Sequence, residues 1–144
     1  MNEINQLDEM YHEIILDHYR SPRNNHVISQ PTKEIESNNP FCGDEIKLQL
    51  KMEGGIIKDI GITGRGCAIS QASASLMGET LLGKQIEEAS VIYHLFRELL
   101  TGELSEDKMD QLGDSVALEG VKKFPIRVKC ALLSWSAMRD MLEE

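Results

Sequence analysis

A run of alternating apolar and polar side chains at residues 45–52 constrains the fold more than any other feature of this sequence. The apolar set is Ile46, Leu48, Leu50 and Met52, and the polar set is Glu45, Lys47, Gln49 and Lys51. Strict alternation predicts a strand with one buried face. Gly54-Gly55 then predicts a tight turn, and residues 56–63 predict a return strand. The sequence therefore predicts a β-hairpin near its middle.

Helical patterns surround this hairpin. Helices are predicted over residues 7–20, 68–82, 86–100 and from Phe124-Pro125 toward the C-terminal end, since apolar residues recur there at helical spacing or glycine and proline mark the helix ends. Residues 33–36 predict a short strand, and the acidic residues 103–120 predict a loop with short helical turns. Strands that come early and helices that come late indicate an α+β fold. With 144 residues, we expect a single domain over residues 1–144.

The composition excludes several classes of function. The formal charge is −9, from 15 basic and 24 acidic residues, which leaves no overall basic field for nucleic acid. No apolar stretch approaches the roughly 18–20 residues of a membrane-spanning helix, and the acidic residues 1–10 do not resemble a secretory signal. Three cysteines are few for a disulfide scaffold. We therefore expect a cytoplasmic protein with reduced thiols and with neither nucleic-acid nor membrane partners.

The first cysteine lies where the chain is expected to bend. Cys42 stands between Pro40 and Gly43, so we expect it at an exposed loop tip just before the first hairpin strand. Asp44 follows two residues later and brings a carboxylate close to the same point.

The other two cysteines are associated with helix starts and positive charge. Cys67 follows Gly64-Arg65-Gly66 and leads directly into a predicted helix, whose N-terminal amides favour a thiolate. Cys130 lies in the first turn or so of the last helix, flanked by Arg127 and Lys129. Nearby positive charge also favours a thiolate.

These groups allow more than one interpretation. Three thiols and one carboxylate match the four ligands of tetrahedral zinc, and three thiolates also suit an iron–sulfur cluster. The cysteines are 25 and then 63 residues apart, so they form no Cys-x-x-Cys knuckle. The residues alone leave open a shared metal site and separate buried thiols. Among the histidines, His18 falls on the apolar stripe of the first helix and is expected to be a half-buried residue with its hydrogen bonds satisfied.

The residues around the three cysteines resemble one known family. Cys42-Gly43-Asp44, residues 64–70 running into 72–75, and residues 124–130 are similar to the motifs of the IscU/NifU-N family of iron–sulfur assembly proteins. The similarity covers nearly the whole chain. Two departures from the IscU type resemble the SufU branch. Lys129 occupies the position of a histidine before the third cysteine, and an acidic insertion spans about residues 93–112.

The resemblance implies both a fold and a function. The fold is a small three-stranded antiparallel sheet packed on one side by helices. The function is iron–sulfur cluster assembly, as a zinc-dependent sulfurtransferase-like carrier. It accepts persulfide sulfur from a SufS-type cysteine desulfurase and acts with downstream iron–sulfur assembly proteins. The alternative is a scaffold that builds and transfers a cluster on the three cysteines, with iron or a transient iron–sulfur cluster at the site.

The resemblance also assigns residues. Zinc ligands are expected at Cys42, Asp44, Cys67 and Cys130. Cys42 is the expected sulfur acceptor, and Arg127 is expected close enough to support a thiolate or to contact the partner.

Overall fold

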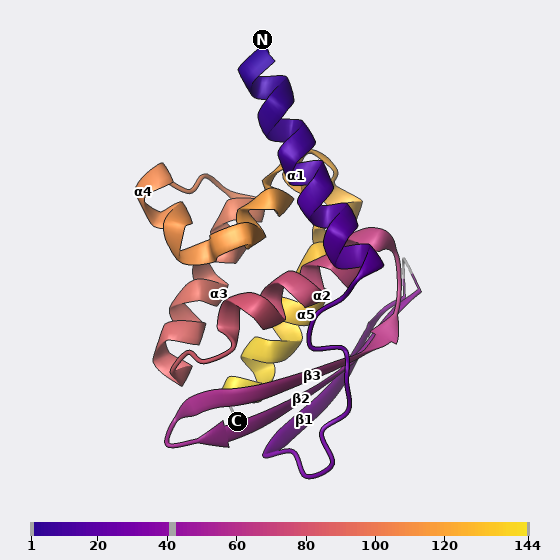
Figure 1. The fold of residues 1–144 in the computed structure, drawn as a ribbon, viewed down its shortest axis with the longest axis vertical. Helices are drawn as coiled ribbons and strands as arrows, with labels where there is room; N and C mark the ends of the chain where they lie inside the picture. The colour runs from indigo at the N-terminus through magenta and orange to yellow at the C-terminus, as the bar shows by residue number, and fades with distance from the viewer. Residues whose placement is uncertain (1, 41–42, 144) are drawn as a thin grey trace.

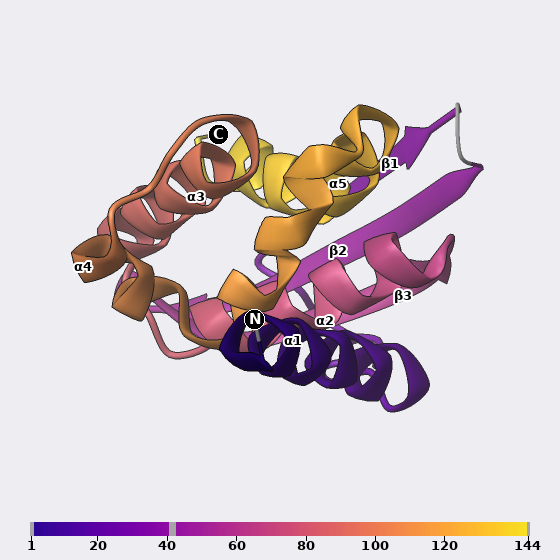
Figure 2. The ribbon, with the colours of Figure 1, turned by 90° about the horizontal axis from the view of Figure 1, so that it is seen from above.

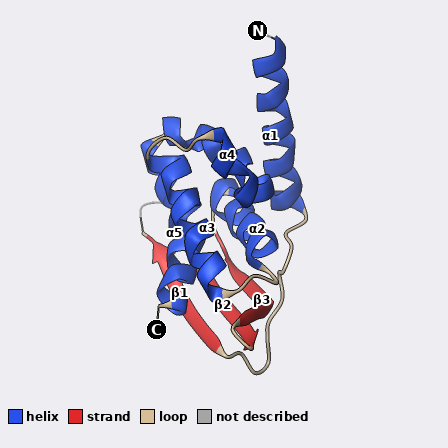
Figure 3. Cartoon of the chain, turned by 90° about the vertical axis from the view of Figure 1, so that its left-hand side faces the viewer, coloured by secondary structure: helices blue, strands red, loops and turns tan. Residues whose placement is uncertain are grey.

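The computed structural model describes residues 2–40 and 43–143, with side chains from residue 10 onward within these ranges. The elements in chain order are α1 (Asn2–Arg20), β1 (Lys33–Asn39), β2 (Asp44–Glu53), β3 (Ile56–Arg65), α2 (Ala68–Leu81), α3 (Ile86–Thr101), α4 (Glu106–Met109), η1 (Asp110–Lys123) and α5 (Pro125–Leu142). The sheet lies on one side and the helices gather on the other (Figures 1 and 3). The predicted α+β fold with a three-stranded sheet is confirmed.

The sheet is built around the predicted hairpin. Its strand order is β1-β2-β3, with both pairs antiparallel. Gly54 and Gly55 form the turn with φ angles of 59° and 77°, a left-handed conformation that glycine adopts without a Cβ penalty. Leu48 and Leu50 are fully buried beneath the helices, as the alternation predicts. Gln49 departs from the pattern. Although it points to the opposite face, it is buried, and its side-chain oxygen accepts the Ile28 N–H at 2.8 Å.

Two helices pack directly on the sheet and a third completes the core. Helix α5 contacts β1 and β2, and α2 contacts β3, so the two lie over neighbouring parts of one face (Figure 2). Helix α3 packs against α5, where the rings of Phe96 and Trp135 stack with centroids 4.1 Å apart. Both side chains are fully buried and anchor the apolar interior. Over the described residues, none of the helices combines the length and the apolar character needed to cross a bilayer.

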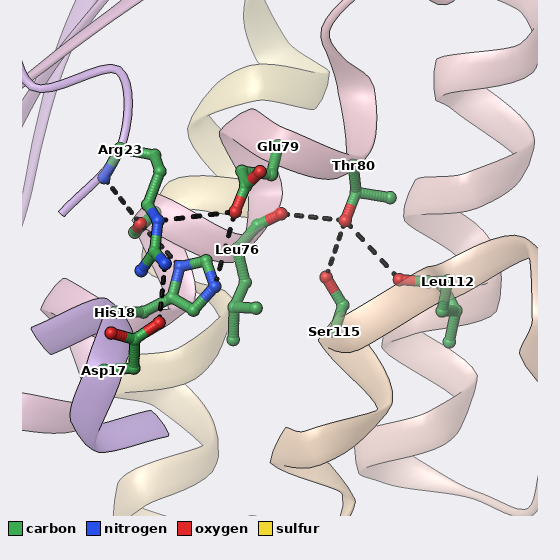
Figure 4. Close-up of polar contacts among 9 residues, drawn as sticks. Asp17, His18, Arg23, Leu76, Glu79, Thr80, Leu112 and Ser115 are labelled. Atoms are coloured by element: carbon green, nitrogen blue, oxygen red, sulfur yellow. Dashed lines mark hydrogen bonds and ion pairs between the residues drawn. The ribbon is translucent and has the colours of Figure 1, made fainter. Parts of the chain in front are cut away.

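The short helical turns predicted for residues 103–120 are present, but they occupy most of the segment, and the loop is confined to its start. Residues of α4 lead into η1, a run of 3₁₀ turns whose backbone leaves the helical region at Gly113. Leu112 and Leu118 are fully buried, so the segment contributes to the core despite its acidic composition. Thr80 of α2 is 2.9 Å from the Ser115 hydroxyl and thereby joins η1 to α2 (Figure 4). Acidic surface residues hid the apolar pattern from the sequence analysis.

A buried polar cluster fixes α1 against α2 (Figure 4). His18 is only 3% exposed, and its Nδ1 lies 2.7 Å from the Ser75 hydroxyl. That hydroxyl oxygen also accepts the Arg23 backbone N–H at 2.9 Å, so its own proton is free to be donated to His18. Nε2 of His18 faces Glu79 at 3.5 Å. This arrangement fits a neutral imidazole. The expected hydrogen bonding of His18 is confirmed, but the residue is more deeply buried than the half-buried position that was predicted. Beyond this contact, the first turns of α1 extend past the other helices (Figures 1 and 3).

We predict that His18 makes stability depend on pH. Burial, followed by the charge of Arg23, holds the pKa of His18 below its usual 6.5, although Glu79, Asp17 and Asp114 oppose the shift. Because the folded state resists protonation of His18, the stabilisation that this buried imidazole provides is fully present above pH 6.5. Below that pH the unfolded state binds a proton more readily than the folded state, so the free energy of unfolding falls. His18→Gln should cost about 1–3 kcal/mol at pH 7.5 and should flatten the loss of stability between pH 7 and 5 in urea unfolding.

The matched control is His12→Gln, which changes an exposed histidine on the same helix. Equal pH profiles for the two variants would contradict the role assigned to His18.

Candidate metal centre

The ends of the strands and the beginning of α2 meet at one edge of the molecule. β1 ends at Asn39, β2 begins at Asp44 directly opposite it, and β3 ends shortly before Cys67. Helix α5 crosses this end of the sheet and brings Cys130 to the same place. One ligand atom each from Asp44, Cys67 and Cys130 all lie within 4.8 Å of one another. In Figure 2 this edge lies at the right, where the strand ends meet.

Asp44 is the most constrained group at this edge. Its side chain is 1% exposed, and Oδ1 accepts the backbone N–H of Cys67 at 2.9 Å. Within the described part of the chain, the buried Oδ2 has no hydrogen-bond partner. A carboxylate oxygen left in this state is costly unless a cation or a donor satisfies it. This oxygen therefore indicates a cation site.

Cys67 is placed by the start of α2. It is the N-cap residue of that helix, and its Sγ accepts the Ser70 backbone N–H at 3.5 Å. The Ser70 hydroxyl donates in turn to the Cys67 carbonyl at 3.1 Å. The sequence-based prediction that Cys67 leads into a helix is confirmed, and the helix amides favour negative charge on its sulfur.

Cys130 lies on the buried face of α5. It is fully buried, in the second turn rather than the first. Its Sγ lies 3.8 Å from the Ile126 carbonyl, the contact of an ordinary helical thiol. The side-chain amide of Asn39 also donates to this sulfur, with Nδ2 at 3.9 Å. Asn39 was not identified from the sequence.

Arg127 brings positive charge to the two thiols. The pKa of Arg127 is raised above its usual value, first by a hydrogen bond with the Cys130 side chain and then by the charges of Cys67 and Cys130. The side chain is otherwise exposed. Arg127 therefore interacts electrostatically with both thiols, and the role that the resemblance implies for it stays a prediction.

The structure brings together three of the four predicted ligand positions. Cys42, the fourth predicted ligand and the predicted sulfur acceptor, lies outside the described residues. Besides Asn39, sequence reasoning also missed Gly66. A Cβ at Gly66 would meet Asp44 Oδ1 and Ser70 Oγ, each at 2.4 Å. Glycine at this position lets the chain pass close to the carboxylate.

The donor set fits zinc. Thiolate and carboxylate groups are both zinc ligands. Among the described residues, the Asp44 Oδ2 atom is buried without a hydrogen-bond partner and stands beside two thiols with nearby N–H donors. Two thiols and one carboxylate supply three donors, and tetrahedral coordination leaves one position for a fourth ligand.

An α+β fold that gathers two thiols and a buried carboxylate at one end of its sheet is the arrangement of a cysteine-ligand metal-binding protein. The NifU-like N terminal domain family matches residues 10–131, and the chain belongs to this family. The chain is 46% identical to the zinc-dependent sulfurtransferase SufU of Bacillus subtilis, over 92% of this chain and 88% of that protein. It is 35% identical to the iron–sulfur cluster assembly scaffold protein IscU of Streptococcus pyogenes, over 97% and 87%.

The fold agrees with these relatives. The chain matches the crystal structure of a proposed iron–sulfur cluster assembly scaffold protein for the SUF system from Fervidobacterium islandicum with a TM-score of 0.85. That match has 34% sequence identity and covers 90% of this chain and 94% of the other. The resemblance to the IscU/NifU-N family is confirmed.

We predict that Gly66→Ala disturbs the metal centre through a single methyl group. The added Cβ would overlap the Asp44 carboxylate and the Ser70 hydroxyl, so these groups must shift at a cost of about 1–3 kcal/mol. Urea unfolding measures this loss. Gly120→Ala is the control, because a Cβ there meets nothing within 4 Å. If the two variants are equally stable, Gly66 does not hold the close contact described here.

Proposed function

We propose that this protein is a zinc-dependent sulfur carrier in iron–sulfur cluster assembly, formed by a single domain over residues 1–144. It accepts persulfide sulfur from a SufS-type cysteine desulfurase. The observation that carries the proposal is the convergence of Asp44, Cys67 and Cys130 around a buried carboxylate oxygen. The SufU relative from Bacillus subtilis, which is named a zinc-dependent sulfurtransferase, supports it.

The residues divide into anchors and an acceptor. Asp44, Cys67 and Cys130 would hold zinc together with Cys42, and zinc when bound would keep the thiols deprotonated and closely spaced. The anchors are carried by a paired strand and two helices. In the sequence, Cys42 lies between the turn-forming residues Pro40 and Gly43, and it is the thiol proposed to react.

The transfer step requires no net oxidation. The Cys42 thiolate attacks the outer sulfur of a cysteine persulfide on the desulfurase. A new sulfur–sulfur bond forms on Cys42, the old one on the donor breaks, and the donor cysteine leaves as a thiolate. Arg127, beside the two anchor thiols, offsets negative charge at the site while this exchange proceeds.

The surface around the thiols suits contact with a partner protein. Phe124 and Ile126 are 61% and 68% exposed and flank the start of α5. Together with Arg127 and the lysines Lys122 and Lys123, Phe124 borders an open groove of about 570 Å³. Exposed large apolar side chains beside a reactive group are typical of an interaction surface. We propose that the desulfurase docks here, in the cytoplasm, before downstream iron–sulfur assembly proteins receive the sulfur.

The alternative is a scaffold that assembles a cluster on Cys42, Cys67 and Cys130. The IscU relative from Streptococcus pyogenes, which is named a scaffold protein, favours it. The presence of Lys129 rather than histidine before the third cysteine favours the carrier, because lysine at this position offers no imidazole ligand to a cluster.

We predict about one tightly bound zinc per chain in protein purified without oxygen. At free zinc about 100 times the dissociation constant, binding adds about 2.7 kcal/mol to stability, which corresponds to roughly 5–11 °C in melting temperature for a chain of this size. Chelation should therefore lower the melting temperature by this amount, and Asp44→Ala should weaken zinc retention. Metal analysis and calorimetry measure both effects.

Equimolar iron and labile sulfide in place of zinc would instead support the scaffold. An unchanged melting curve after confirmed metal loss would show that the fold does not depend on the metal.

We predict that Cys42→Ala abolishes the stimulation of a cysteine desulfurase, because the accepting thiolate is removed. Mass spectrometry of the trapped wild-type intermediate should place the additional sulfur on Cys42. The melting temperature of the variant serves as the control for folding. Full stimulation by Cys42→Ala, or additional sulfur mainly on Cys67 or Cys130, would rule out the assigned acceptor.

A further inference from the structure

The last residue pair of the β1–β2 ladder contacts both described thiol residues. Asn39 and Asp44 lie opposite each other, and both are buried. Asp44 accepts the backbone N–H of Cys67 at 2.9 Å. Asn39 donates its side-chain amide to Cys130 Sγ, with Nδ2 at 3.9 Å. One cross-strand pair therefore positions a thiol residue on each of two helices.

A side-chain amide is a suitable neighbour for a thiolate. An N–H directed at an anionic sulfur stabilises its charge and lowers its basicity, as outer groups do for other metal ligands. Asn39 is 7% exposed, so water competes little for this contact. Cys67 receives its donor from a helix backbone N–H, that of Ser70. Cys130 lies within α5, where the backbone N–H groups are hydrogen-bonded to carbonyl groups of the preceding turn. The N–H donor to its sulfur therefore comes from the side chain of Asn39 on β1.

We propose that Asn39 is a positioning residue that holds the Cys130 thiolate on the metal while Cys42 accepts sulfur. This inference rests on the proposed zinc-dependent carrier. Only four residues, 40–43, separate Asn39 from Asp44, and Cys42 is one of them. Asn39 and Asp44 therefore flank the segment that carries the reacting thiol, and each of them contacts one of the two anchor thiol residues.

The test compares substitutions at two neighbouring asparagines on β1. Asn39→Ala removes the donor, and Asn39→Asp removes it with little change in shape and adds a negative charge. Asn38→Ala and Asn38→Asp are the matched controls, because Asn38 is exposed on the same strand. Zinc affinity is measured by competition with a chromophoric chelator. We expect both Asn39 variants to lose about 10–100-fold in affinity, with the larger loss for Asn39→Asp, and both Asn38 variants to stay within about twofold of the wild type.

A spectroscopic measurement separates positioning from a purely structural role. In the cobalt-substituted protein, loss of the amide donor raises the energy of the sulfur lone pair, so the thiolate-to-cobalt charge-transfer band of Asn39→Ala should move to longer wavelength. A residue that only supports the fold would lower the melting temperature of the metal-free protein and leave this band unmoved.

The possible results test the role of Asn39 and the carrier function separately. An unshifted band, or zinc affinities of the Asn39 variants equal to those of the Asn38 variants, overturns the role of Asn39. Wild-type protein that binds zinc tightly but gains no sulfur on Cys42 overturns the carrier function, while affinity and band position still decide whether Asn39 holds Cys130. Wild-type protein that binds neither zinc nor cobalt overturns both.

Discussion

The arrangement of this end of the molecule depends on one buried carboxylate. Asp44 is removed from water, yet in the described structure only one of its oxygens has a hydrogen-bond partner. Burial of a charged group without compensation is unfavourable by several kcal/mol. The groups that surround it come from separate parts of the chain, so the strands, α2 and α5 must all be in place before the charge is matched. Folding and site formation are therefore coupled at this edge.

The remainder of the molecule is stabilised differently. The stacked Phe96 and Trp135 and the fully buried leucines form an apolar interior that involves no charged group. This interior joins α3, α5 and the sheet, and the segment from α4 through η1 covers part of it. A core of this kind holds α2 and α5 in position and thereby places Cys67 and Cys130 close to Asp44.

The sequence predicted the elements better than their contacts. Alternation over residues 45–52 identified the hairpin because the apolar side chains there fall on one face of the strand, although the polar Gln49 on the other face is also buried. Acidic residues in 103–120 masked buried leucines, so the short helical turns of that segment were expected but its burial in the core was not. Because the cysteines are far apart in the chain, the residues alone did not decide between a shared metal site and separate buried thiols. Only the resemblance of the motifs to a known family favoured the shared site. Asn39 went unnoticed because its importance comes from the strand register opposite Asp44.

In the proposed carrier, the short connection between Asn39 and Asp44 limits how far the acceptor thiol of Cys42 can lie from the anchors. Two residues of fully extended chain span roughly 7 Å, so the Cα atom of Cys42 stays within that distance of the Cα atom of Asp44. A carrier tethered this closely cannot act as a long swinging arm that reaches into a deep channel. The proposed function therefore implies that the donor brings its persulfide to the end of the sheet where Asp44, Cys67 and Cys130 lie.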